Sequence, residues 1–156
     1  MSNENTGDTK SAFKLERYKF ILQQINTLNE NVHKYLTLYQ TLATAIVGGV
    51  VLIVVSWKQL KIDAPTARAG VEGLLCLFIV LTLFILGSIG AGIASWFDYR
   101  NEENEVLNEA VSEGYRKPPK FGNLWRWNET YVFIFIVVMA LVVCGYIGFW
   151  LMPLIV

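Results

Sequence analysis

Three apolar stretches without a single charged residue constrain this chain more than any other feature. They cover residues 41–57, 73–97 and 131–156, and none of them contains Asp, Glu, Lys, Arg or His. A helix needs about 20 predominantly apolar residues to cross the ~30 Å hydrocarbon core of a bilayer. Each stretch therefore predicts a membrane-spanning helix, and the chain as a whole is predicted to be an all-α integral membrane protein.

The uncharged spans also narrow the classes of function. Pumps, coupled transporters and membrane enzymes normally use ionisable residues inside the membrane. The sequence contains no GxGxxG, Walker, CxxC, HExxH or GxSxG motif. We therefore expect no enzyme activity, no catalytic residue, no cofactor and no metal. The remaining alternative is an enzyme that uses only residues at the membrane–water interface. Cys76 and Cys144 are interpreted as small core residues and His33 as an ordinary residue at a polar boundary.

The distribution of basic residues predicts the orientation of the chain. The segment before the first span and the link between the second and third spans together carry ten Lys and Arg. The link between the first and second spans carries three, and the C-terminus carries none. By the positive-inside rule the N-terminus is predicted to be cytoplasmic and the C-terminus external. Trp residues, which favour the headgroup layer, lie at or near the span ends: Trp57, Trp96, Trp125, Trp127 and Trp150.

The segment before the first span is predicted to form an amphipathic, coiled-coil-like helix over residues 12–40, after a disordered start at residues 1–11. Apolar residues recur with alternating spacings of three and four, which is the heptad pattern. The a and d positions are Leu15, Tyr18, Leu22, Ile25, Asn29, Val32, Leu36 and Tyr39, and the g positions Ile21, Leu28 and Tyr35 widen the stripe.

Within this stripe we expect Leu22, Ile25, Asn29 and Val32 to mediate oligomerisation. Asn29 is its one polar member. A buried Asn in a coiled coil can determine register and subunit number. The alternative is that Asn29 faces water, or bonds a neighbouring helix without specifying an assembly.

Small residues recur four apart in the second span. The pattern predicts a helix-packing face formed by Gly87, Ala91, Gly92 and Ser95, because small residues let helix backbones approach closely in lipid. Such patterns also arise by chance in Gly-rich spans. The sequence leaves open whether this face packs within one subunit or between subunits.

The remaining segments complete the predicted domain organisation. An external loop is expected at residues 58–72, and an acidic cytoplasmic helix followed by a basic, Pro-containing turn at residues 98–129, with the third span at 130–156. The acidic helix is expected to stop at Gly114, a typical residue after a helix C-terminus. Its net charge of −5 over residues 98–113 opposes +3 over residues 10–34. We therefore expect two helices to extend into a cytoplasmic helical bundle.

The acidic helix permits two interpretations. In a ring of subunits its carboxylates would stack at a pore mouth and select for cations. Alternatively, the acidic run is only a solvated helix face. The residues concerned are Glu102, Glu103, Glu105, Glu109 and Glu113. Nucleic-acid binding is not expected, because the exposed helices are mixed or acidic in charge.

Two runs carry a resemblance to a known family. They are RYKFILQQINTLNENVHKYLTLYQTLATAIVGG, entering the first span, and SWFDYRNEEN, leaving the second. Over residues 14–105 the chain resembles the SLATT-type small bacterial membrane proteins of anti-phage and nucleotide-signalling conflict systems. The resemblance implies a cytoplasmic helix before a pair of spans in a prokaryotic inner membrane, and a membrane-perturbing or pore-forming effector. The third span departs from that two-span core, and the family supplies no catalytic residues.

These observations lead to two functional hypotheses. The first is a homo-oligomeric inner-membrane effector that permeabilises or depolarises the membrane as a cation-conducting pore in anti-phage defence. The second is a non-conducting anchor that holds a cytoplasmic protein partner at the bilayer through the N-terminal helix. A pore should depolarise cells when it is overexpressed, whereas an anchor should be harmless alone.

Overall fold

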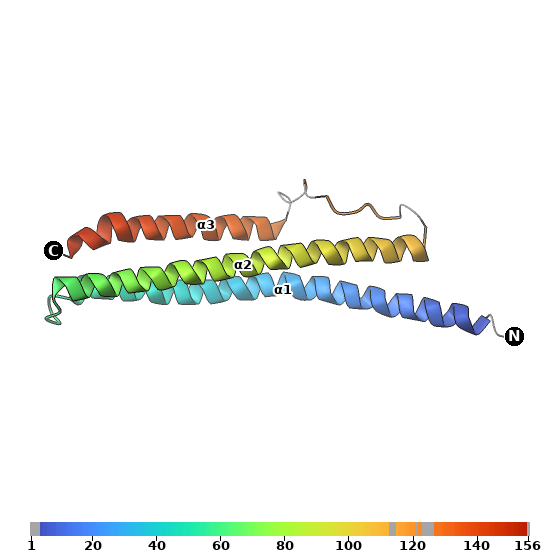
Figure 1. The fold of residues 1–156 in the computed structure, drawn as a ribbon, viewed down its shortest axis with the longest axis horizontal. Coiled ribbons are helices and arrows are strands. Elements are labelled where there is room, and N and C mark those ends of the chain that lie inside the picture. Colours follow the sequence, from blue (N-terminus) through green and yellow to red (C-terminus); the bar gives the residue numbers. More distant parts are fainter. Residues whose placement is uncertain (1–3, 113–114, 121, 123–126, 156) are drawn as a thin grey trace. The chain divides into compact units, whose positions relative to one another are not determined.

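Three long helices follow one another along the chain (Figure 1). The computed structural model describes residues 4–112, 115–120, 122 and 127–155. Helix α1 spans Glu4–Ser56, α2 spans Ala64–Ala110 and α3 spans Asn128–Tyr146. The chain then continues as a π-helical turn, η2 (Ile147–Leu151), and a 3-10 turn, η3 (Met152–Leu154). The described residues contain no strand, which confirms the all-α fold class.

Each predicted span overlaps one of the three long helical segments, and the third span continues from α3 through η2 and η3. The segments Lys10–Ser56, Ala64–Ala110 and Glu129–Leu154 are all long and apolar enough to cross a membrane. Large apolar side chains on their outer surfaces are exposed, among them Leu83, Phe84, Leu141, Val142 and Phe149. Such exposure fits helices whose surroundings are lipid rather than water, since lipid tails are as apolar as these side chains. Three helices capable of spanning a membrane are thus confirmed.

Two helix boundaries differ from the sequence-based expectations. Helix α1 begins at Glu4, inside the segment 1–11 for which disorder was expected. Helix α2 begins at Ala64, inside the expected loop 58–72, so that only residues 57–63 link it to α1. Helix α2 ends at Ala110, and the expected stop at Gly114 lies outside the described residues.

The early start of α2 has a clear local cause. The Asp63 carboxylate accepts a hydrogen bond from the Thr66 backbone N–H at 3.1 Å, and Pro65 lies in the first helical turn. Asp at the N-cap and Pro near the first helical position are both helix-start signals. Hydrogen bonding from Thr66, first by its side chain and then by its backbone N–H, lowers the pKa of Asp63. The capping interaction is therefore present above the ordinary carboxyl pKa and is lost as the pH falls through the lowered value.

The turn after α1 is closed by a left-handed residue. Lys61 has a φ of 54°, and its N–H donates to the Lys58 carbonyl at 3.3 Å. The Ile62 N–H donates to the Trp57 carbonyl at 3.0 Å, and the Ile62 side chain packs against the core cluster that contains Trp57. This pair of hydrogen bonds with an apolar contact is a Schellman motif, in which Gly is the usual left-handed residue.

Lys61→Gly should therefore stabilise the protein. Glycine adopts positive φ without the steric cost that a Cβ imposes, and we expect a gain of about 0.5–1 kcal/mol in the free energy of unfolding. Unfolding of the purified protein in mixed micelles measures it. Lys58→Gly is the matched control and should destabilise, because Lys61 is the one non-glycine residue with positive φ in the described ranges. Equal destabilisation by both variants would contradict this interpretation.

The chain divides into two units, which we call the polar unit and the apolar unit. The polar unit comprises Met1–His33 and Gly90–Trp127, and the apolar unit comprises Lys34–Ile89 and Asn128–Val156. In the apolar unit a buried cluster joins all three helical segments: Val50, Val54, Trp57, Ala67, Val71, Ile147, Leu151 and Ile155. Arg68 Nε donates to the Ile155 carbonyl at 3.0 Å and so satisfies a carbonyl at the end of the last helix.

In the polar unit the buried side of α1 is formed by the d and g positions of the heptad pattern. Ile21, Ile25 and Val32 are buried there. The a positions lie at its edge: Leu15 and Leu22 are exposed, and so is Asn29. Of the four residues expected to mediate oligomerisation, the structure therefore places Ile25 and Val32 in the chain's own core. Leu22 and Asn29 remain on the surface.

Candidate functional site

Opposite charges meet across the polar unit. Lys14 Nζ lies 3.0 Å from Glu109 Oε2, and Arg17 forms an ion pair with Glu102. Each pair joins the first part of α1 to the last part of α2. The charge pattern of the sequence predicted that these two helices attract each other, and the ion pairs are the contacts by which they do so. Exposed ion pairs of this kind contribute only ~0–1 kcal/mol each to the free energy of folding. They therefore align the two helices more than they stabilise them.

Glu103 lies at the centre of a buried charge cluster. Its side chain is 0% exposed, and its two oxygens accept hydrogen bonds from Arg100 and Arg116, both at 2.6 Å. Arg100 lies one turn earlier on α2, whereas Arg116 comes from the segment after the helix. A carboxylate can be buried without large cost only when it is paired and hydrogen-bonded. Arg116 therefore ties residues 115–120 back onto α2.

The five acidic residues predicted for a pore mouth thus have different surroundings. Glu102 and Glu109 contact cations of α1, and Glu103 is buried between two arginines. Glu105 is exposed, and Glu113 lies outside the described residues. Sequence reasoning treated them as one face and missed the burial of Glu103. The available signal was the spacing of Arg100 and Glu103, since residues three apart on a helix are neighbours.

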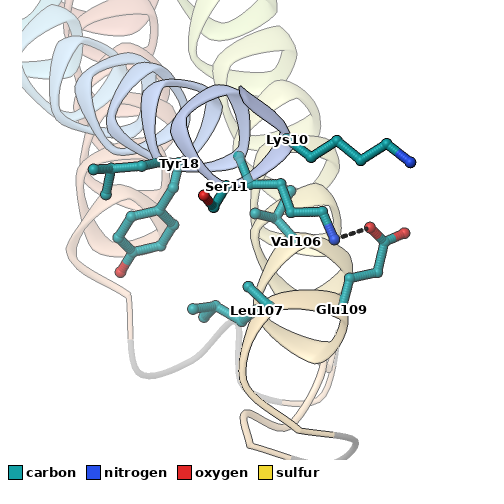
Figure 2. Close-up of a pocket in the computed structure, with 9 residues that line it drawn as sticks. Lys10, Ser11, Tyr18, Val106, Leu107 and Glu109 are labelled. Atoms are coloured by element: carbon teal, nitrogen blue, oxygen red, sulfur yellow. Dashed lines mark ion pairs between the residues drawn. The ribbon is translucent and has the colours of Figure 1, made fainter. Parts of the chain in front are cut away.

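A groove of about 500 Å³ lies between the start of α1 and the end of α2, within the polar unit (Figure 2). Figure 2 shows Lys10, Ser11 and Tyr18 on one side and Val106, Leu107 and Glu109 on the other. Lys14, Leu15 and Ala110 complete the lining. The groove is therefore mostly apolar, with two lysines and one glutamate. Sequence analysis did not predict it, because its walls come from segments about 90 residues apart.

Two glycines of the small-residue face of α2 have open space beside them among the described residues. Gly87 and Ala91 are exposed, and Gly92 and Ser95 are half-buried. A Cβ added at Gly87 or Gly92 would meet no atom within 4 Å. A Cβ added at Gly49 of α1, by contrast, would lie 3.3 Å from Leu74 Cδ1. Close packing inside the apolar unit therefore uses Gly49, whereas Gly87 and Gly92 have space beside them.

Aromatic residues mark the point where α2 leaves its uncharged stretch. The rings of Trp96 and Trp127 lie 4.2 Å apart between centroids, and Phe97 lies 4.9 Å from Trp127. The Arg100 guanidinium lies over the Trp96 ring at 5.1 Å. A pocket of about 170 Å³ opens beside this group, lined by Trp96, Arg100, Arg116, Lys117 and Pro119. Trp125, the other tryptophan predicted near this end, lies outside the described residues.

Among the described residues, no three His, Cys, Asp or Glu side chains are grouped so that they could hold a metal ion. Fold and site together define the chain as an all-helical protein with three helices able to cross a membrane. No family model, no curated protein and no solved structure matches the chain. The site must therefore be interpreted from its own geometry.

Proposed function

We propose that this chain is a homo-oligomeric membrane protein. The observation that carries the proposal is the space beside Gly87 and Gly92, where no other part of the described chain comes within 4 Å of an added Cβ. In lipid, helices associate mainly by close packing at small residues, so a second copy of the chain is the natural occupant of this face. The exposed heptad residues Leu22 and Asn29 offer a further contact between copies outside the spans.

We further propose that the charged parts of the polar unit, the N-terminal part of α1 and the part of α2 beyond Phe97, lie in the cytoplasm and that the protein resides in a prokaryotic inner membrane. The ten basic residues on the predicted inner side support this orientation. In this orientation the N-terminal part of α1 and the C-terminal part of α2 form the cytoplasmic bundle, and the C-terminus is external.

Assembly is proposed to act on the permeability of the membrane, as the resemblance to SLATT-type effectors in anti-phage defence implies. A lumen between uncharged spans would be apolar and would stay closed by dewetting until it widened. Of the acidic residues, Glu105 is exposed, and Glu102 and Glu109 could approach an axis only with their cationic partners beside them.

Reconstitution into liposomes tests the proposal directly. The protein should cross-link into a defined multimer, and proteoliposomes should lose entrapped potassium or dye above the rate of empty vesicles. Overexpression should also depolarise cells, as reported by a potential-sensitive dye. Single copies in tight vesicles would overturn both assembly and permeabilisation. A multimer in tight vesicles would overturn permeabilisation alone.

A second candidate function is a non-conducting anchor for a cytoplasmic protein, and the groove of Figure 2 favours it. The groove lining is mostly apolar, and it contains two lysines but a single glutamate, which already binds Lys14. These features fit an amphipathic partner helix that places an apolar side chain in the groove and a carboxylate near Lys10.

A photo-crosslinker at Tyr18 tests the anchor function. It should capture one protein species in native membranes, and Leu15→Asp, in the groove lining, should abolish the capture. Phe13→Asp is the matched control, because Phe13 is as exposed as Leu15 but does not line the groove. Equal loss in both variants, or capture of a second copy of this chain, would contradict the anchor function.

A further inference from the structure

The pocket beside Trp96 carries an excess of positive charge. Arg100, Arg116 and Lys117 contribute three cations to its lining, and one carboxylate, Glu103, opposes them. The cluster therefore retains a net charge of +2. Lys117 is exposed and makes no ion pair within the described ranges. The pocket is thus suited to an anion rather than to a cation or a neutral ligand.

The arginines are held in place by the chain itself. Glu103 binds both guanidinium groups at 2.6 Å, and the Trp96 ring supports Arg100 from one face. The Arg100 Nε is buried and has no hydrogen-bond acceptor among the described residues. Arginine is the preferred side chain for phosphate because its donors match the geometry of the oxygens. Two arginines held in place in this way, with donors left over, have the chemistry of a phosphate site.

The place of the pocket along α2 identifies the source of the phosphate. No charged residue lies on α2 between Glu72 and Asp98, and Trp96 and Phe97 are the last residues of that uncharged stretch. Trp rings favour the membrane–water interface. Arg100 lies one helical turn beyond Trp96, at about 1.5 Å per residue, which is the level of the lipid phosphates if α2 crosses the bilayer. Basic pockets at this level bind the headgroups of anionic lipids.

We infer that the pocket formed by Trp96, Arg100, Arg116, Lys117 and Pro119 binds the phosphate group of an anionic phospholipid. Glu103 positions the two arginines, Lys117 supplies the unpaired cation, and the Trp96 and Trp127 rings lie beside the first part of the lipid chains. The inference requires α2 to cross the membrane but requires neither assembly nor permeabilisation.

Native mass spectrometry of the full chain tests the inference. The protein is released from micelles that contain equal amounts of phosphatidylglycerol and phosphatidylcholine, and the retained lipid is counted. We expect phosphatidylglycerol to be retained in preference. Lys117→Gln should weaken that preference about fivefold, which corresponds to one basic residue near an anionic lipid surface. Because Lys117 is exposed and the ion pairs of Glu103 within the described residues are made by Arg100 and Arg116, this variant should fold normally.

Lys120→Gln is the matched control, since Lys120 is exposed in the same segment but does not line the pocket. It should leave the preference unchanged. Three results would overturn the inference: no preference in the wild-type protein, an equal loss in Lys120→Gln, or displacement of the lipid by millimolar inorganic phosphate. The last result would identify free phosphate as the ligand.

Discussion

Glu103→Gln should destabilise the polar unit by about 3 kcal/mol. The substitution keeps the size of the side chain but removes the charge that two arginines share, so that Arg100 and Arg116 lose their counter-ion. Removing one partner of a buried ion pair typically costs 3–5 kcal/mol, because the other charge is left uncompensated. We expect the low end of that range, since Arg100 and Arg116 are 22% and 47% exposed and water screens them in part.

Urea unfolding in micelles, followed by tryptophan fluorescence, measures this effect, because Trp96 and Trp127 stack in the same unit. Glu105→Gln provides the control: it removes the same charge two residues further along α2, at an exposed position. That variant should change the free energy of unfolding by less than about 0.5 kcal/mol. If both variants unfold at the same urea concentration, Glu103 is not the centre of the cluster.

The spans were the part of the fold that the sequence could predict. Absence of charge over about 20 residues is a constraint that any three-dimensional arrangement must satisfy, because lipid offers no partner for an ion. Each of the three predicted spans accordingly overlaps a helical segment that is long and apolar enough to cross a membrane. The charge complementarity of residues 10–34 and 98–113 was equally informative, and two ion pairs now join those helices.

The ends of the helices and the partners of individual side chains were harder to predict. Asp63 and Pro65 were interpreted as loop residues, although the same pair is a helix-start signal, and only the hydrogen bond to Thr66 distinguishes the two interpretations. The apolar stripe of residues 12–40 was wide enough to pack either along its a and d positions or along its d and g positions. Which of these faces the interior depends on where α2 packs, and periodicity alone does not contain that information. One partner of Glu103, Arg100, lies three residues earlier on the same helix, but the other, Arg116, lies 13 residues away beyond the helix end and could not be assigned from helical spacing.

Gly92→Leu should weaken assembly strongly and leave the fold of the single chain intact. The added side chain begins in a place where no atom of the chain lies within 4 Å, so nothing in the fold opposes it at that point. In a multimer built on the small-residue face, the same side chain would separate the two helix backbones. We expect association to weaken at least about tenfold, equivalent to 1.4 kcal/mol, as measured by cross-linking across a range of protein-to-lipid ratios.

Substitutions at two other glycines serve as controls for the Gly92→Leu variant. Gly73→Leu also enters open space on α2 but lies outside the small-residue pattern, and it should retain both fold and assembly. Gly49→Leu, in contrast, is directed at Leu74 and should disturb packing within the chain, so any loss of assembly there would come with lower stability. A Gly92→Leu variant that still assembles like wild type would exclude the small-residue face as the contact between copies. Because membrane leakage is proposed to depend on assembly, dye efflux from vesicles should fall in Gly92→Leu and persist in Gly73→Leu.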